Sequence, residues 1–279
     1  MCLFAVMLFP GTGHAASLDY GGKVGFEHFQ WEEFAAEGYR YLKESGTRNV
    51  LSGFLGNTLG VNKQFIYRAE AKIYFGTVNY DGRTQATEGQ PSVPVQSDTT
   101  YNGLNVEGEA GFRTGKADGS FAWDFVGRAD VDRWIREIAA STDNTGRPTG
   151  KAREEYTIMN LRIGTGPNWR SGRWQGRLIA GFKYPIYTDE YVKKEYTNYD
   201  RDINLEPKGQ ISPFLNFYNN VKLSERFWLT FDAFYDTYRF DQSNYVEVLD
   251  YHDGKYKYAY QPKSTQDNYG LQAGVIVSF

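Results

Sequence analysis

Apolar and polar residues alternate one by one along most of this chain. In the run 65–75 every second residue is apolar or aromatic, and Arg68, Glu70 and Lys72 lie between them. A period of two places successive side chains on opposite faces of a β-strand. The same alternation recurs near residues 18–26, 104–113, 121–132, 174–186, 227–236 and 268–279, and less regularly near 49–60, 156–165 and 210–220. The pattern predicts about ten strands that are long enough to cross a membrane.

The connections between these runs alternate between short and long. Short connections lie near residues 61–64, 114–119, 166–172 and 222–225, and long polar ones near 32–48, 80–100, 135–153, 188–208 and 241–266. Outer-membrane barrels have this asymmetry, with short turns in the periplasm and long loops outside. We therefore predict an all-β fold, a transmembrane antiparallel up-and-down β-barrel of about ten strands with short periplasmic turns and five long extracellular loops.

The polar face of the predicted strands is expected to line the barrel. A sheet crosses lipid only when it closes on itself, because every backbone N–H and C=O must be paired within the protein. The predicted lumen charge network comprises Arg68, Glu70, Lys72, Glu107, Glu109, Arg113, Asp124, Arg128, Asp130, Asp132, Arg177, Lys183, Asp232 and Asp236. Opposite charges on adjacent strands can pair directly. Because ten strands leave little more room than their side chains fill, we expect a largely occluded lumen.

Two alternatives to an occluded barrel use the same residues. A soluble sheet would bury the apolar face in a core and leave the charges solvated, but it gives no reason for the alternating loop lengths. A selective pore would use the charges to line a passage. Stabilisation of the barrel by paired charges is the interpretation that we favour over a pore.

Aromatic residues lie near the ends of the predicted strands. They are Tyr20, Trp31, Tyr101, Trp134, Tyr187, Tyr238 and Phe240. Amphipathic rings favour the headgroup level of a membrane. We predict that these rings form the two interfacial girdles of the barrel.

The last predicted strand carries the most specific pattern in the chain. It reads Tyr269-Gly-Leu-Gln-Ala-Gly-Val-Ile-Val-Ser-Phe279, and its alternating positions are Tyr269, Leu271, Val275, Val277 and Phe279. This strand resembles the β-signal by which the assembly machinery recognises bacterial outer-membrane proteins. The ten-strand, five-loop plan is similar to that of the omptin proteases. The resemblance implies the outer membrane of a Gram-negative bacterium, with the barrel assembly machinery, outer-membrane lipid and lipopolysaccharide as partners.

The first residues have the pattern of an export signal. An apolar core from Cys2 to Phe9 is followed by a break and by Ala15 and Ala16. This predicts a signal peptide over residues 1–16 and a barrel over 17–279, with a buried N-terminal helix as the alternative. The single cysteine would leave with the signal, so the mature chain would have no disulfide, thiolate metal site or thiol nucleophile.

Composition adds two exclusions. Lys and Arg number 31 against 34 Asp and Glu, which gives a net charge of −3. Binding to nucleic acid needs a basic surface that neutralises phosphates, so no nucleic-acid partner is expected. The remaining histidines, His28 and His252, are far apart in the sequence, and we predict no metal site and no cofactor.

The omptin resemblance raises one catalytic possibility. Omptins use acidic residues and a histidine at the outer rim, and the matching residue types here are Asp130, Asp132, His252 and Asp253. A carboxylate pair can hold a water, and a histidine oriented by a carboxylate can act as a base. The pattern departs from that of omptins, because His252 and Asp253 are adjacent and lie in the last loop. The site is therefore kept only as the alternative.

The predicted loops are rich in Tyr, Asn, Asp, Lys and Gly, above all over residues 187–202 and 245–260. Tyrosine supplies contact area at low entropic cost, so these loops suit an extracellular or envelope protein partner, a glycan or a surface polymer. We predict a non-enzymatic outer-membrane barrel that acts in surface interaction, envelope structure or slow passage of a small solute. The alternative is an omptin-like endopeptidase with its site at the extracellular rim.

Overall fold

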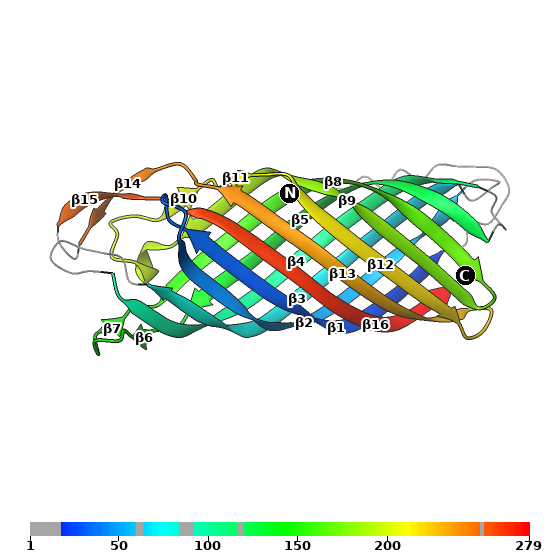
Figure 1. Ribbon diagram of the computed structural model, residues 1–279, viewed down its shortest axis with the longest axis horizontal. Coiled ribbons are helices and arrows are strands. Elements are labelled where there is room, and N and C mark those ends of the chain that lie inside the picture. Colours follow the sequence, from blue (N-terminus) through cyan, green and yellow to red (C-terminus); the bar gives the residue numbers. More distant parts are fainter. Residues whose placement is uncertain (1–17, 60–63, 84–91, 116–119, 252–253) are drawn as a thin grey trace.

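The computed structural model describes residues 18–59, 64–83, 92–115, 120–251 and 254–279. Ten long antiparallel strands form one closed, tilted sheet (Figure 1). They are β1 (Asp19–Phe34), β2 (Arg40–Leu59), β3 (Phe65–Arg83), β4 (Pro94–Thr114), β5 (Phe121–Ile138), β8 (Ala152–Ser171), β9 (Trp174–Val192), β12 (Ser212–Lys222), β13 (Phe227–Asp241) and β16 (Lys263–Ser278). Each strand pairs with the next in sequence, and β16 pairs with β1. The predicted up-and-down barrel is confirmed.

Period-2 burial shows which face of each strand points into the barrel. Along β5, Arg128 and Asp130 are buried, whereas Phe125 is 50% exposed. On the neighbouring strands the outward side chains of Ile163 and Phe182 are 71% and 58% exposed. Apolar side chains exposed to this extent on every strand form the lipid-facing belt of a membrane barrel.

The belt covers only part of the length of the barrel. On β1 the outward residues change from Val24 and Phe26 to Gln30 and Glu32, and on β3 Phe75 is followed by outward Thr77. The change occurs toward the end that carries the long loops, which we call the loop end; the other end is the turn end. The strands therefore continue beyond the lipid at the loop end, which is extracellular in barrels of this type.

The predicted loop 32–48 is wrong, because most of it is strand. β1 extends to Phe34, β2 begins at Arg40, and residues 35–39 alone connect them. The predicted loops 135–153 and 188–208 likewise begin with the last residues of β5 and β9. Beyond the belt the outward face is polar, so these strand ends have the composition of a loop.

The predicted aromatic girdles are wrong for five of their residues. Trp31, Tyr101, Trp134, Tyr238 and Phe240 are only 1–2% exposed and point into the barrel. Their positions have the inward parity of their strands, which the prediction overlooked.

The other two predicted girdle residues do face outward. Tyr20 stacks on Phe279 with ring centroids 5.5 Å apart at the turn end, and Tyr187 is 48% exposed. Rings in these positions are placed to contact the membrane interface.

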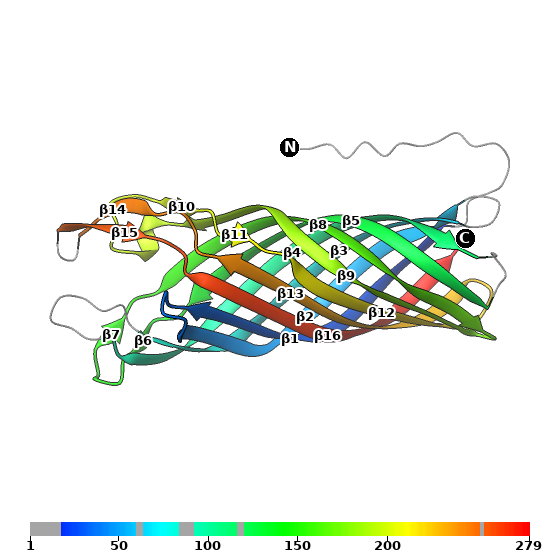
Figure 2. The same ribbon diagram turned by 45° about the horizontal axis from the view of Figure 1, so that its top comes forward.

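Shorter secondary-structure elements lie at the loop end (Figure 2). They are the hairpins β6 (Ser141–Thr142) with β7 (Pro148–Thr149) and β14 (Val246–Asp250) with β15 (Lys255–Ala259), the short strands β10 (Ile203–Leu205) and β11 (Lys208–Gly209), and the 3-10 turn η1 (Lys194–Tyr196). β10 and β11 extend the barrel sheet along β9 and β13. The described residues contain no helix that is long and apolar enough to cross a membrane.

Replacing Leu271 by arginine is expected to destabilise the barrel by about 2–4 kcal/mol, because its side chain meets the lipid core. Leu271 is 54% exposed on the outward face of β16, within the belt. Thr265→Arg is the matched control, because Thr265 has the same parity on the same strand beyond the belt. Unfolding in denaturant from lipid vesicles measures both. Equal losses in the two variants would contradict the position of the belt.

Candidate functional site

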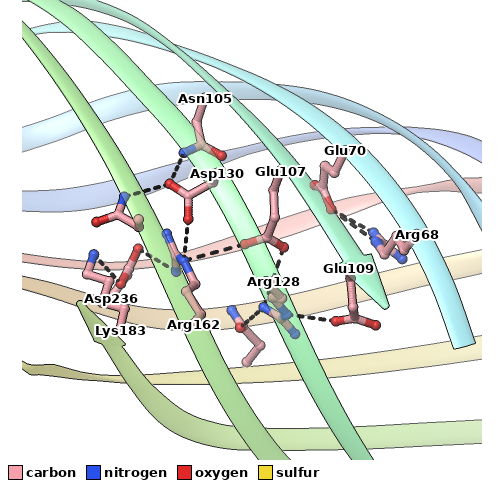
Figure 3. Close-up of polar contacts among 12 residues, drawn as sticks. Arg68, Glu70, Asn105, Glu107, Glu109, Arg128, Asp130, Arg162, Lys183 and Asp236 are labelled. Atoms are coloured by element: carbon pink, nitrogen blue, oxygen red, sulfur yellow. Dashed lines mark hydrogen bonds and ion pairs between the residues drawn. The ribbon is translucent and has the colours of Figure 1, made fainter. Parts of the chain in front are cut away.

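The charged interior at mid-height of the barrel is organised around Asp130 on β5 (Figure 3). Its Oδ1 accepts a hydrogen bond from Nε of Arg162 at 2.5 Å. Its Oδ2 accepts from the side-chain amides of Asn105 and Asn160, at 3.1 and 2.7 Å. The donors come from β4 and β8, the two strands that flank β5. Three donors thus hold this carboxylate in place, as a buried charge requires.

Arg162 carries the network across the lumen. Its Nη1 donates to Oδ2 of Asp236 on β13 at 3.1 Å, and Nζ of Lys183 on β9 lies 2.7 Å from Oδ1 of the same carboxylate. β8 and β13 are separated in the sheet by β9 and β12. The Arg162–Asp236 pair therefore links strands that are not neighbours (Figure 3).

A second set of ion pairs links β1 to strands that are not its neighbours in the sheet. Nζ of Lys23 on β1 lies 2.7 Å from Glu70 on β3 and 2.9 Å from Asp232 on β13. Beside it, Arg48 on β2 donates from Nε and Nη2 to Oε1 of Glu27, at 3.0 and 2.6 Å. The side chains of Lys23, Arg48 and Glu27 are at most 2% exposed. Ion pairs so deeply buried cross-link the wall, because neither partner can move without leaving the other charge unpaired.

Toward the turn end, guanidinium groups share two carboxylates. Arg113 and Arg177 each donate from Nε to Asp124, at 2.7 and 2.8 Å. Arg128 donates to Glu109 at 2.7 Å, and Arg177 Nη2 lies 2.9 Å from that side chain. These contacts join β4, β5 and β9 into one ladder of alternating charge.

At the loop end one cation contacts three carboxylates, with a fourth nearby. Arg136 on β5 contacts Glu33 at 3.2 Å, Glu44 at 2.9 Å and Glu154 at 2.6 Å. Glu190 lies in the same cluster, is 1% exposed, and its Oε2 has no hydrogen-bond partner among the described residues. Arg136 is thus the group that neutralises most of this cluster.

An aromatic layer lies between this loop-end cluster and the mid-height network. Trp134 stacks on Tyr156 with centroids 5.0 Å apart, and Trp31 meets the same ring edge-on at 5.8 Å. The layer, which we define by its cluster of buried residues, comprises Phe29, Trp31, Leu42, Val50, Tyr74, Val78, Tyr101, Trp134, Tyr156, Ile158, Tyr238 and Phe240. The interior of the barrel therefore contains an apolar core as well as a charge network.

Two cavities interrupt the packing of the interior. One, of about 80 Å³, lies at mid-height between Lys72, Glu107 and Asp236. The other, of about 450 Å³, lies at the turn end and is lined by Arg68, Arg177 and further polar residues. Neither is lined by Trp31, Trp134 or Tyr156. Both cavities therefore lie on the turn-end side of these rings.

The charged residues predicted for the lumen all lie on the inward faces of their strands. All but Asp132 take part in an ion pair. Asp132 instead accepts hydrogen bonds from the hydroxyls of Tyr74 and Tyr238, at 2.7 and 3.1 Å. The structure thus brings the predicted residues together in one interior.

Sequence reasoning missed other members of this interior. They are Lys23, Glu27, Glu33, Glu44, Arg48, Arg136, Glu154 and Glu190. Most of them lie in stretches with the composition of loops, or at the inward positions of β1 between its outward apolar residues. The inward positions of β1 fall at every second residue, and following them from Lys23 through Glu27 to Glu33 identifies these buried charges.

Of the residues considered for an omptin-like site, the two on β5 do not lie at the rim. Asp130 and Asp132 lie beneath Trp134 on β5, with the aromatic layer between them and the loop end. His252 and Asp253 lie outside the described residues. Among the residues that the structure describes, no group of three or more His, Cys, Asp or Glu side chains is arranged to hold a metal ion.

The predicted assembly signal forms the outward face of β16. Tyr269, Leu271 and Val275 alternate with inward Gln272 along a strand that pairs with β1 over its whole length. Val277 and the terminal Phe279 continue this face to the turn end. The strand that closes the barrel is thus the one that carries the pattern.

Comparison with known proteins identifies the fold. No protein-family model and no curated protein sequence matches the chain. Among solved structures, the outer-membrane protease OmpT from Escherichia coli superposes with a TM-score of 0.68 at 11% identity, covering 94% of this chain and 97% of that one. The translocator domain of the autotransporter NalP from Neisseria meningitidis gives a TM-score of 0.44 at 12% identity, covering 96% and 90%. The chain therefore has the fold of Gram-negative outer-membrane β-barrel proteins, and with its apolar belt this fold places it in an outer membrane.

Proposed function

We propose that this protein is a non-enzymatic outer-membrane barrel with an occluded lumen, which serves as a rigid anchor for extracellular loops that interact at the cell surface. The observation that carries this proposal is the aromatic layer. Its rings Trp31, Trp134 and Tyr156 are 2–3% exposed although they face the interior of a membrane barrel. Side chains that fill the lumen to this degree leave no water-filled path past them.

The charge network is a second, independent argument for an occluded lumen. Lys23 and Arg162 each bind carboxylates on strands that are not their neighbours. A solute that entered from the turn end would have to break such pairs, and separating a buried pair costs about 3–5 kcal/mol. Slow passage of a small solute is therefore the less favoured role.

The partners follow from this placement. Outer-membrane lipid would contact the belt, lipopolysaccharide would surround the polar outer face above it, and the barrel assembly machinery would recognise β16. An extracellular or envelope protein, a glycan or a surface polymer would bind at the loop end. A peptidase at the rim receives no support from Asp130 and Asp132, since donors occupy both carboxylates beneath the aromatic layer.

Single-channel recording in a planar bilayer tests the occluded lumen. We expect no current steps above background from the refolded protein, because the aromatic layer blocks hydrated ions. A general porin added to the same bilayer is the positive control. A heat-modifiable band on a denaturing gel must show that the protein is folded. Stable steps from the folded protein would contradict the proposal.

A further inference from the structure

The hairpin β14–β15 stands at the loop end of the barrel (Figure 2) and has two chemically different faces. Its strands pair antiparallel, with Glu247 opposite Tyr258 and Leu249 opposite Tyr256. Directly opposite residues share one face of a sheet, and the face continues at every second position. We call this the tyrosine face and define it by Tyr245, Glu247, Leu249, Tyr251, Tyr256, Tyr258 and Tyr260.

The tyrosines of this face are exposed. Their exposed fractions run from 44% for Tyr260 to 68% for Tyr256. Tyr245 contacts the rings of Tyr258 and Tyr260, with centroids 6.2 and 5.1 Å apart, so these three rings are contiguous. The tyrosine face lies at the loop end, and the lipid-facing belt does not extend to it. Contact with the lipid core does not explain these rings.

The opposite face of the hairpin is fixed to the barrel. Val248 is fully buried against Val192 and Ile203, and Val246 and Ala259 pack on the same cluster. A ligand that binds the tyrosine face therefore meets a supported surface. Little ordering entropy is lost on binding to such a surface.

Polar contacts hold the hairpin in the same position. Asp200 Oδ1 accepts from the backbone N–H of Leu249 at 3.0 Å, and the N–H of Tyr251 donates to the carbonyl of Asn198 at 2.8 Å. Hydrogen bonds from Arg201 and from the Leu249 N–H keep the pKa of Asp200 below its usual range. The Asp200 contact therefore persists through the neutral range of pH.

The charge of the tyrosine face indicates the class of its ligand. Among the described residues of this face Glu247 alone is charged, whereas Lys255 and Lys257 belong to the other face. Leu249 is the sole aliphatic residue and is partly buried. Rings that carry hydroxyls offer both apolar contact and hydrogen bonds. A neutral chain with apolar C–H faces and many hydroxyls complements such a surface, because each of its units offers an apolar face to a ring and hydroxyls to the ring hydroxyls.

We propose that the tyrosine face binds a neutral, polyhydroxylated glycan chain outside the cell. This inference rests on the proposed role of the barrel as an anchor for extracellular loops, and it names the ligand class of one of them. The rings stack on the C–H faces of successive sugars, and the tyrosine hydroxyls exchange hydrogen bonds with the sugar hydroxyls. Tyr256 and Tyr258, which are opposite Leu249 and Glu247, lie at the middle of the tyrosine face.

A printed array of neutral and anionic glycans, probed with the full-length refolded protein in detergent, tests the inference. We expect binding to neutral glycans. The Tyr256→Ala/Tyr258→Ala variant is expected to lose about tenfold or more in affinity, the effect of truncating central aromatic anchors. Tyr39→Ala is the matched control, because Tyr39 is 56% exposed in the β1–β2 turn and does not belong to the tyrosine face. Tyr256→Phe/Tyr258→Phe separates ring stacking from hydroxyl hydrogen bonding and should retain part of the affinity.

Three results would overturn the inference: no binding to any neutral glycan, binding only to anionic glycans, or equal loss in the Tyr39→Ala control. Capture of a protein or of a second copy of the chain through the same tyrosines, without glycan binding, would also overturn it. A heat-modifiable gel band checks that each variant is folded. Failure here leaves the proposed function standing as long as the bilayer recordings remain silent, so the two proposals can fail separately.

Discussion

Replacing Arg136 by alanine is expected to destabilise the barrel by about 3–5 kcal/mol, the cost of removing one partner from a buried ion cluster. The guanidinium is 2% exposed and contacts Glu33, Glu44 and Glu154. Its removal leaves three carboxylates, with Glu190 beside them, without their shared cation. The free energy of unfolding in guanidinium chloride, measured from lipid vesicles, gives the size of the effect.

Arg133→Ala is the matched control on the same strand. The side chain of Arg133 is 65% exposed and contacts Glu155 at 3.3 Å on the outer surface. A surface pair of this kind contributes about 1 kcal/mol or less. Adding Glu44→Gln to the Arg136→Ala variant should restore part of the lost stability, because it removes one of the unpaired charges. Equal losses for Arg133 and Arg136 would show that the cluster does not depend on its cation.

The sequence predicts the barrel well wherever lipid imposes the pattern. Within the belt an outward residue must be apolar, so Phe125 and Ile163 alternate with Arg128 and Arg162, and the alternation can be read without a structure. Beyond the belt water replaces lipid, and outward Gln30 no longer contrasts with its neighbours. The predicted strands therefore end too early at the loop end.

The same physical reason explains how much of the interior could be predicted. The charges of the mid-height network alternate with belt residues, and their inward position follows from parity. Their pairing does not follow, because the contact of Lys23 with Asp232 joins residues 209 apart in the sequence and depends on barrel closure. Arg136 and Glu44 do not stand out in the sequence, because the strand ends that carry them have the polar composition of loops. The aromatic layer was missed because Trp31 and Trp134 were assigned to a girdle by type rather than by parity.

The two kinds of interior contact have different consequences for function. Ion pairs hold strands together but leave cavities of about 80 and 450 Å³ at mid-height and at the turn end. Packed rings fill the cross-section at the loop end, where the largest buried side chains include Trp31, Tyr101 and Tyr238. If the lumen is occluded as we propose, the barrier to passage is expected in the aromatic layer, on the loop-end side of both cavities.

Removing both tryptophans of this layer is expected to turn a silent barrel into a conducting one. Trp31→Ala/Trp134→Ala deletes the two indole rings that contact Tyr156, one stacked and one edge-on. Each deletion costs about 3–5 kcal/mol of packing and cavity energy, and it opens a constriction that excluded water. We expect stable current steps in planar bilayers where the parent protein gives none.

The control for this variant removes two tryptophans from the outer surface. Trp123 and Trp174 are 39% and 52% exposed in the belt, so Trp123→Ala/Trp174→Ala removes comparable volume without touching the lumen. We expect it to remain silent. Both variants must keep the heat-modifiable band, which shows that they are folded. If the folded Trp31→Ala/Trp134→Ala barrel is also silent, the charge network beneath the layer must close the lumen by itself, because Arg162, Lys183 and Asp236 would then be the remaining barrier along the axis.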